Sequence, residues 1–235
     1  MTNSTERPLA IVSGAASGIG CAIARGFLDA GYTVIGLDRS AEGWAAEHYR
    51  QIALDVSDSA AVAAFGAGIE RAAVLVNAAG IIQRSAEFDV AVFERVIDIN
   101  LTGTMRLCTA LRPGLTQAKG SIINLASMLS FFGGALVPGY SASKGGIVSL
   151  TRSLAIAWAN DGIRVNALAP GWFATPLTAA LREDPKRSGT ILERTPLGRW
   201  GQPEDLVGPA LFLAGPASRF VTGVVLPVDG GYSIA

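Results

Sequence analysis

Short apolar runs alternate along this chain with longer stretches of helical character. We interpret seven of the runs as strands, at residues 9–12, 33–37, 51–54, 73–76, 121–125, 163–168 and 223–228. Strands that alternate with helices form parallel sheets covered by helices on both faces. The alternation therefore predicts one α/β domain over residues 1–235, a doubly wound parallel sheet with its site at the carboxyl ends of the strands.

The first strand runs into a glycine-rich turn and then into a helix expected over residues 21–30. Glycines allow a close approach of the backbone, and the helix N-terminus offers free N–H groups and the positive end of the helix dipole. A turn of this kind between a strand and a helix suits the pyrophosphate of a dinucleotide. Its candidate cofactor contacts are Gly14, Ser17, Gly18, Ile19 and Gly20.

The second strand ends in Asp38, 18 residues after Gly20. A carboxylate there can accept hydrogen bonds from both hydroxyls of the adenosine ribose and would repel a 2′-phosphate. Arg39 acts in the other direction, because its guanidinium can stack on adenine or meet a phosphate. On balance the sequence favours NAD over NADP.

Residues 41–50 have no strong helical period, so we expect a loop or a reduced helix there. The next strand leads to Asp55 and Val56, which we place beside the adenine ring. Ser57 is the expected cap of a helix over residues 58–66. The connection from the second strand to this point is therefore short, and it sets the shape of the adenine edge.

The fourth strand is followed by Asn77, Ala78 and Gly80, where the chain can pass close to a ribose and a nicotinamide. One long helix is expected over residues 90–115. Asn100 lies inside it although asparagine is a poor helix former. We expect Asn100 either to serve a site or to bend the helix.

Tyr140 and Lys144 are four residues apart just after Pro138, so they share one face of a helix that begins there. A tyrosine phenol has a pKa of roughly 10, and a nearby cation such as Lys144 would lower it. Ser127, which follows the strand at residues 121–125, would present its hydroxyl to the same pocket. The segment therefore predicts an acid/base site at Tyr140.

The charge balance and the histidine and cysteine content exclude several classes of function. The chain has 19 basic and 19 acidic residues, so no basic field attracts nucleic acid or anionic lipid. Its one histidine is His48, and neither Cys21 nor Cys108 has a partner at metal-binding spacing. We expect a small-molecule binding protein without a metal site.

The sequence also predicts a cytoplasmic protein. Residues 1–8 lack the basic start and apolar run of a signal peptide. The uncharged stretch at residues 120–143 contains too many serines and glycines for a membrane span. Two free cysteines suit a reducing compartment.

Together these motifs resemble the short-chain dehydrogenase/reductase family from Leu9 to the end of the chain. The family's Thr-Gly-x-x-x-Gly-x-Gly motif corresponds to residues 13–20, with serine in place of threonine, and its Asn-Asn-Ala-Gly motif corresponds to residues 77–80, with Ala78 at the second position. Its Asn-Ser-Tyr-Lys tetrad is matched by Asn100, Ser127, Tyr140 and Lys144.

The resemblance implies a Rossmann-like fold in which Tyr140 exchanges a proton with the substrate while hydride passes to or from NAD. It implies that Ser127 holds the substrate oxygen and that Lys144 binds the nicotinamide ribose and lowers the pKa of Tyr140. It also implies that Asn100 anchors a water that relays protons. The segment expected to close over the nicotinamide contains Pro170, Gly171 and Thr175.

Residues 80–84, 126–131, 170–175 and 198–201 are similar to bacterial 2-deoxy-D-gluconate 3-dehydrogenases and gluconate 5-dehydrogenases. This resemblance implies a sugar-acid substrate, whose carboxylate an arginine can hold through two hydrogen bonds. In or near the expected lid, residues 172–200, the candidates are Arg84, Arg182, Arg187, Arg194 and Arg199. Arg84 is the first choice because it follows the Gly80 turn, and Met128 and Trp172 would line the same pocket.

Other readings remain open. The enzyme could reduce or oxidise another carbonyl or alcohol, such as a 3-oxoacyl thioester or a cyclic alcohol. A protein that senses dinucleotides without turnover is a further alternative, although such a protein would not need the complete tetrad. The resemblance also implies a homotetramer built through the helices that begin near Val90 and Tyr140.

Overall fold

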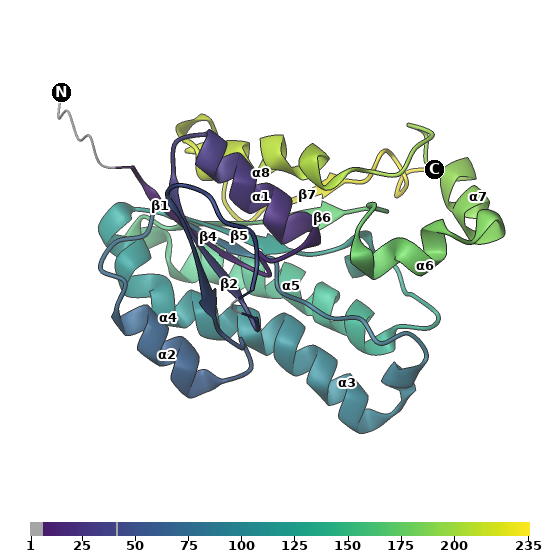
Figure 1. Cartoon of the computed structure of the whole chain (residues 1–235), viewed down its shortest axis with the longest axis horizontal. Coiled ribbons are helices and arrows are strands. Elements are labelled where there is room, and N and C mark those ends of the chain that lie inside the picture. Colours follow the sequence, from purple (N-terminus) through teal and green to yellow (C-terminus); the bar gives the residue numbers. More distant parts are fainter. Residues whose placement is uncertain (1–6, 41) are drawn as a thin grey trace.

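The computed structural model describes residues 7–40 and 42–235. Its centre is a seven-stranded sheet in the order β3-β2-β1-β4-β5-β6-β7, and every neighbouring pair is parallel (Figure 1). The predicted doubly wound α/β fold is confirmed. Residues 1–6, which belong to the stretch read as lacking a signal peptide, and Ala41, the first residue of the expected loop, lie outside the described residues.

The strands and helices follow one another along the chain as the sequence predicts. The strands are β1 Leu9–Ser13, β2 Thr33–Asp38, β3 Tyr49–Ala53, β4 Val74–Asn77, β5 Ser121–Leu125, β6 Arg164–Pro170 and β7 Val225–Val228. The helices are α1 Gly18–Asp29, α2 Ser59–Ala67, α3 Val90–Ile97, α4 Gly103–Ala118, α5 Pro138–Ala157, α6 Ala179–Arg182, α7 Pro185–Glu193 and α8 Val207–Ala214.

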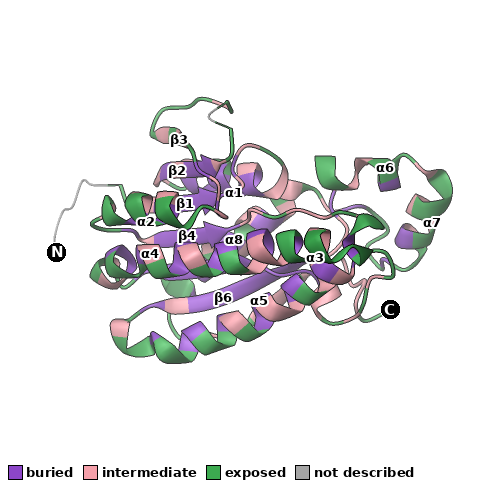
Figure 2. Cartoon of the chain, turned by 90° about the horizontal axis from the view of Figure 1, so that it is seen from below, coloured by how far each residue is buried: buried purple, intermediate pink, exposed green. Residues whose placement is uncertain are grey.

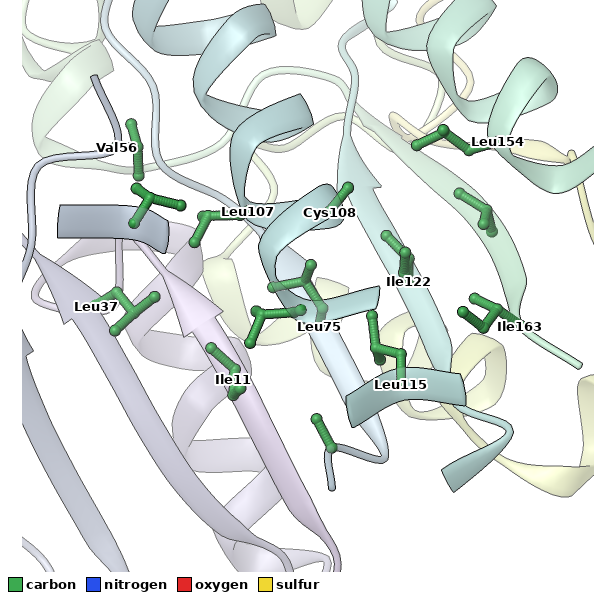
Figure 3. Packing of buried hydrophobic residues seen from close by; sticks show 14 of the residues in the cluster. Ile11, Leu37, Val56, Leu75, Leu107, Cys108, Leu115, Ile122, Leu154 and Ile163 are labelled. Atoms are coloured by element: carbon green, nitrogen blue, oxygen red, sulfur yellow. The ribbon is translucent and has the colours of Figure 1, made fainter. Parts of the chain in front are cut away.

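The central strands are buried on both faces because successive side chains point to opposite sides of the sheet. Ile11, Leu75 and Ile122 pack with Leu107 and other residues of α4 on one face (Figure 3). The residues that alternate with them, such as Val12, Val76 and Ile123, pack on the other face with α1 and α8. Figure 1 shows this division, with α1 and α8 above the sheet and α2 to α5 below it. The apolar runs of the sequence are nearly continuous because alternate side chains of each central strand enter the hydrophobic cores on opposite faces of the sheet.

The prediction of one continuous helix over residues 90–115 is wrong. The helix is interrupted by a π-helical segment, Asp98–Thr102, that separates α3 from α4 and contains Asn100. The Asn100 side chain is turned inward and is buried. Segments of this kind inside α-helices are often associated with functional sites.

Several element boundaries differ from those expected. Helix α1 begins at Gly18, inside the glycine turn, and β3 begins at Tyr49. The cap of α2 is Asp58, whose carboxylate accepts hydrogen bonds from two backbone N–H groups, and not Ser57. The Ser57 hydroxyl donates instead to Asp55, 2.7 Å away. The change of cap follows from side chains that bond to local partners, which the hydrophobic pattern does not record.

Residues 42–48 contain no helix, as expected for a loop or a reduced helix. Trp44 stacks on Tyr49 with their ring centroids 3.8 Å apart, and the Arg25 guanidinium lies 4.6 Å from the Trp44 ring. The Trp44 indole N–H donates to the carbonyl of Ala15 over 3.1 Å. The loop therefore supports the glycine turn from outside.

Helices α6 and α7 fall within the expected lid. They stand apart from the helices that cover the sheet, at the same end of the molecule as the C-terminus (Figure 1). Most of their surface is exposed (Figure 2), but Leu181, Ile191 and Trp200 form a small core of their own. The segment that contains α6 and α7 thus has a small core of its own beside the sheet.

Membrane-spanning helices and metal-binding clusters are both unexpected from the sequence. No helix within the described ranges, residues 7–40 and 42–235, is long and apolar enough to cross a membrane. Within the same ranges, no three histidine, cysteine or acidic side chains come together as a metal site would require.

Candidate active site

A cavity of about 460 Å³ lies beyond the carboxyl ends of β5 and β6. Ser127, Tyr140 and Lys144 all line it, together with Gly80 and Pro170. The sequence places these residues in four separate segments, and the parallel sheet brings them together because its strands end on one side. The structure thus brings Ser127, Tyr140 and Lys144 to one cavity.

The turn that carries Ser127 is bonded to the helix that carries Lys144. The Ser127 hydroxyl accepts a hydrogen bond from the backbone of Leu129 over 3.1 Å, and the Ser127 N–H donates to the hydroxyl of Ser130 over 3.2 Å. The Ser130 hydroxyl in turn donates to the carbonyl of Lys144 over 2.7 Å. These bonds fix the position of Ser127 relative to α5.

Lys144 is 5% exposed and its ammonium donates to the carbonyl of Leu125 over 2.6 Å. Burial lowers the pKa of Lys144 to about 8, because the charged form loses hydration. The ammonium lies 5.6 Å from the centroid of the Tyr140 ring. Lys144 is thus held between the end of β5 and the phenol.

The pKa of Tyr140 is raised, and burial is the main cause. The Ser127 side chain and the charge of Arg84 lower the pKa, while the charge of Glu87 raises it. Lys144, the cation expected to lower this pKa, is not among these causes. The cation that acts on the phenol is Arg84.

Glu87 is a buried carboxylate that sequence reasoning missed. It is 1% exposed, and its two oxygens accept hydrogen bonds from the backbone of Gln83 over 2.7 Å and of Tyr140 over 2.8 Å. Glu87 and Tyr140 are 53 residues apart, so no local pattern marks the contact. The presence of a glutamate shortly before α3 is the sole trace of it in the sequence.

The Asn100 side chain holds the backbone of Ile81 at both of its polar groups. Its amide donates to the Ile81 carbonyl over 2.9 Å, and its oxygen accepts from the Ile81 N–H over 2.8 Å. The amide also donates to the hydroxyl of Ser143 over 3.1 Å. Asn100 thus ties the segment after β4 to α5, a positioning role that the tetrad motif does not reveal.

A second cavity, of about 340 Å³, runs along the glycine turn to the ends of β2 and β3. A side chain on Gly14 would lie 2.8 Å from the backbone N of Ala79, and one on Gly20 would collide with the carbonyl of Gly14. Gly18 has φ +55°, which favours glycine. All five predicted contacts of the turn line this cavity: Gly14, Ser17, Gly18, Ile19 and Gly20.

Asp38 and Asp55 line the far end of the second cavity, as expected. The Asp38 carboxylate is fixed by the backbone N–H of Ala16 at 3.2 Å and of Arg39 at 2.8 Å. Hydrogen bonds from Ser57 hold the pKa of Asp55 below its usual value. Val56 lies beside them.

Asn77 is the one predicted cofactor contact that lines neither cavity. Its side chain is buried in the sheet, where it donates to the side chain of Asn124 over 2.9 Å and meets the sulfur of Cys108. The structure thus does not bring the Asn77 side chain to the wall of either cavity. The neighbouring Ala78 and Gly80 line both cavities.

The two cavities share part of their walls, so they form one groove. The shared residues are Ile19, Ala78, Gly80, Thr175 and Leu177. Pro170 and Gly171 line the first cavity beside them. A groove that passes from a fixed carboxylate, over a glycine turn, to a tyrosine–lysine pair fits a nicotinamide dinucleotide, with its adenosine at Asp38 and its nicotinamide near Tyr140.

Three of the five candidate arginines line the first cavity: Arg84, Arg187 and Arg194. Arg182 does not, and Arg199 forms an ion pair with Asp205 at 2.6 Å elsewhere. Met128 and Trp172 line the cavity as expected. The indole N–H of Trp172 is buried and has no acceptor within the described part of the chain.

Comparisons with known proteins agree with this geometry. A family model described as enoyl-(acyl carrier protein) reductase matches residues 14–233. The chain is 42% identical over 246 residues to a 2-dehydro-3-deoxy-D-gluconate 5-dehydrogenase of Pseudoalteromonas atlantica, covering 97% of each. It is 41% identical over 244 residues to a galactitol 2-dehydrogenase (L-tagatose-forming) of Cereibacter sphaeroides, covering 96% of this chain and 94% of that protein.

A solved structure shows the same fold over almost the whole chain. The gluconate 5-dehydrogenase of Burkholderia cenocepacia J2315, in complex with NADP and tartrate, matches with a TM-score of 0.90 and 34% identity, covering 98% of this chain and 96% of that one. Sequence, fold and groove therefore agree. This chain belongs to the short-chain dehydrogenase/reductase family of oxidoreductases, which use a nicotinamide dinucleotide.

Proposed function

We propose that this protein is an NAD-dependent dehydrogenase of sugar acids, with Tyr140 as the acid/base. The observation that carries the proposal is the single groove, in which the Asp38 end and the end with Tyr140, Lys144 and Ser127 share walls. A substrate in the first cavity would lie between the tyrosine and the nicotinamide. Hydride transfer requires that juxtaposition.

Asp38 supports the choice of NAD. Its carboxylate is anchored by two backbone N–H groups and lines the adenosine end of the groove. An anchored anion cannot turn away from a 2′-phosphate, so NADP would bind at a cost in repulsion. Arg39 lines the same end and is the feature that opposes this choice. The gluconate 5-dehydrogenase of Burkholderia cenocepacia, whose structure contains NADP, also argues against this choice.

Each residue of the tetrad has its own role in binding or proton transfer. When bound, the dinucleotide supplies the hydride acceptor for oxidation and the donor for reduction. Ser127 donates a hydrogen bond to the substrate oxygen, and Tyr140 removes its proton in oxidation or returns it in reduction. Lys144 holds the nicotinamide ribose from the buried side. Asn100 would serve a proton relay through an anchored water.

The raised pKa of Tyr140 predicts how the rates of reduction and oxidation change with pH. Near neutral pH the phenol is protonated, which suits proton donation during carbonyl reduction. Oxidation needs the phenolate, so its rate rises with pH. The charge of Arg84 and the Ser127 side chain counter the effect of burial on the same group.

Polar groups of the first cavity support an acidic, hydroxylated substrate. Arg84 is half-buried beside Tyr140, where its guanidinium can meet a carboxylate. The gluconate and 2-dehydro-3-deoxy-D-gluconate dehydrogenases among the relatives point to the same class.

A neutral polyol is the second candidate substrate, because one relative is a galactitol 2-dehydrogenase. A 3-oxoacyl thioester or a cyclic alcohol would suit the apolar part of the wall, which includes Met128, Phe132 and Leu136. A dinucleotide-sensing protein without turnover is the candidate from another class. Only an assay with several substrates separates these cases.

We also propose a cytoplasmic homotetramer. Val90, Met105 and Ile156 are exposed apolar side chains on α3, α4 and α5. Their burial between copies of this chain would remove apolar surface from water. Sedimentation velocity would give the number of subunits.

The proposed activity is tested by the initial rate of NAD reduction, with NADP in parallel. The panel contains D-gluconate, 2-deoxy-D-gluconate, 2-keto-3-deoxygluconate, galactitol, D-glucitol and cyclohexanol, with a 3-oxoacyl thioester tested in the direction of reduction. Turnover of the acids with NAD supports the proposal. Turnover confined to neutral substrates contradicts the sugar-acid part, and dinucleotide binding without any turnover contradicts the enzyme.

A further inference from the structure

Arg84 and Arg187 meet at the first cavity from distant parts of the chain. Arg84 lies in the segment between β4 and α3, whereas Arg187 lies on α7 of the lid. The lining residues of this cavity include no aspartate and no glutamate. Arg84 and Arg187 therefore border a common space whose lining residues include no acidic side chain.

Neither guanidinium has a carboxylate partner within residues 7–40 and 42–235. The one hydrogen bond of the Arg84 side chain is a long one, 3.4 Å, to the carbonyl of Leu177. Burial is the main reason that the pKa of Arg84 is lowered, and the positive charge of Arg187 lowers it further, while the charges of Tyr140 and Glu87 act in the opposite direction. The two cations thus repel each other, and an anion between them would remove that repulsion.

Arg194, the third arginine of the cavity, is engaged differently. Its guanidinium lies 4.4 Å from the Tyr232 ring centroid and 5.4 Å from that of Phe132. It also donates to the carbonyl of Ala235 over 3.3 Å. Stacking and this hydrogen bond hold Arg194 in place, so the free pair is Arg84 and Arg187.

We propose that one carboxylate of the substrate bridges Arg84 and Arg187, joining the lid helix α7 to the segment after β4 across the substrate. This inference rests on the proposed function, and it adds Arg187 as a residue that determines specificity for acids. The chemical class of ligand is a hydroxylated monocarboxylate whose reacting carbon reaches Tyr140. A neutral polyol of the same length lacks the group that would link the two arginines.

The bridge predicts that replacing Arg187 has a different effect from replacing Arg84. Arg84 also acts on the pKa of Tyr140, so its replacement changes the reaction of every substrate. Arg187 is not among the charges that shift the pKa of Tyr140. Replacement of Arg187 should therefore affect acids alone.

The test uses the full chain and the variants Arg187→Gln, Arg84→Gln and the double variant. Arg182→Gln is the matched control, since Arg182 is an exposed arginine of the same lid that does not line the cavity. The substrates are D-gluconate and D-glucitol, which differ in one terminal carboxylate. Both steady-state kinetics and the thermal stabilisation of the protein by each compound are measured.

Arg187→Gln is expected to raise the KM for gluconate by about 10- to 100-fold, the effect of one lost charge-assisted hydrogen bond, with little change for glucitol. Stabilisation by gluconate should fall in parallel. The double variant should lose less than the product of the two single losses, because both arginines hold one group. Arg182→Gln should match the wild type on both compounds.

Two results would overturn the bridge while leaving the dehydrogenase intact: an Arg187→Gln variant with unchanged gluconate kinetics, or one that is impaired equally on gluconate and glucitol. If wild-type protein neither turns over nor is stabilised by gluconate, yet oxidises glucitol, the acid substrate and the bridge both fail. Failure of the bridge is thus distinguishable from failure of the proposed function.

Discussion

The Glu87 carboxylate accepts a hydrogen bond from the backbone N–H of Tyr140 over 2.8 Å at the N-terminus of α5. Its other oxygen accepts from the N–H of Gln83, the residue before Arg84. One buried side chain therefore fixes both the start of the helix that carries the tyrosine and the segment that carries the arginine. We propose that Glu87 acts on the reaction through Tyr140, as a positioning residue.

Glu87→Gln should lower kcat about 10-fold or more, because an NH₂ group replaces one of the two oxygens that accept from Gln83 and Tyr140, so that one hydrogen bond is lost and Tyr140 shifts. The variant should leave the binding of NADH nearly unchanged. Since the charge of Glu87 raises the pKa of Tyr140, its removal lowers that pKa. The alkaline rise of the oxidation rate should then begin at lower pH, as a pH–rate profile would show.

The exposed Glu94 on α3 supplies a control for this prediction. Glu94→Gln should leave both kcat and the pH profile as in the wild type. If Glu87→Gln lowers the stability of the protein but leaves the pH–rate profile unshifted, Glu87 has only a structural role.

Asp38→Asn should change the preference between the two dinucleotides. The amide oxygen keeps one of the backbone hydrogen bonds, but the negative charge at the ribose is lost. We expect kcat/KM with NAD to fall by about 10- to 100-fold, the effect of a lost charged hydrogen bond, and kcat/KM with NADP to rise. Parallel steady-state assays measure both. A wild-type enzyme that already prefers NADP would contradict this role of Asp38.

Lys144 should make the free energy of unfolding of the protein depend on pH. Its pKa is lowered to about 8 in the folded chain from an ordinary value of 10.5, so the unfolded chain binds more protons in between. Stability from this group therefore rises with pH across that window, by on the order of 3 kcal/mol in total. Lys144→Met lacks the titrating group and should lack this rise.

Urea unfolding of wild type and Lys144→Met at several pH values between about 7 and 10 gives the difference directly. Other groups titrate in both proteins and cancel in the comparison. A difference in the free energy of unfolding that stays constant over this range would show that the buried lysine has an ordinary pKa.

Asn100→Ala should destabilise the fold by about 2 to 4 kcal/mol, since it leaves both polar backbone groups of Ile81 unpaired. Chemical denaturation measures the loss. Asn160→Ala, at an exposed position after α5, should cost little. Equal stability of the two variants would mean that the Asn100 contacts do not hold the segment after β4.

The parallel sheet and its two covered faces follow from the sequence pattern, because strands buried on both faces of a parallel sheet are typically near-continuous apolar runs, as at residues 73–76. The order of the strands is not predicted and comes from the structure. The glycine turn and the positions of Ser127, Tyr140 and Lys144 follow from local motifs. These features depend on residues that are close in sequence or on strand ends that the topology brings together.

Other features depend on contacts between distant residues and could not be predicted in that way. Asn77 fits the cofactor motif by position, yet its side chain turns to Asn124 in the neighbouring strand. The π-helical segment at Asn100 requires knowledge of the Ile81 backbone, and the burial that raises the pKa of Tyr140 appears only once α5 is packed. In each case a specific polar partner, absent from the local pattern, decides the outcome.

The central claim is that Tyr140 transfers the proton in this groove, and Tyr140→Phe tests it most directly. The variant keeps the ring and loses the hydroxyl, so it should bind NADH with unchanged affinity, measured by fluorescence titration. Its turnover of the best acid substrate should fall by about 100- to 10,000-fold, the usual contribution of general acid–base catalysis. A variant that binds NADH and retains most of the wild-type rate would contradict the account.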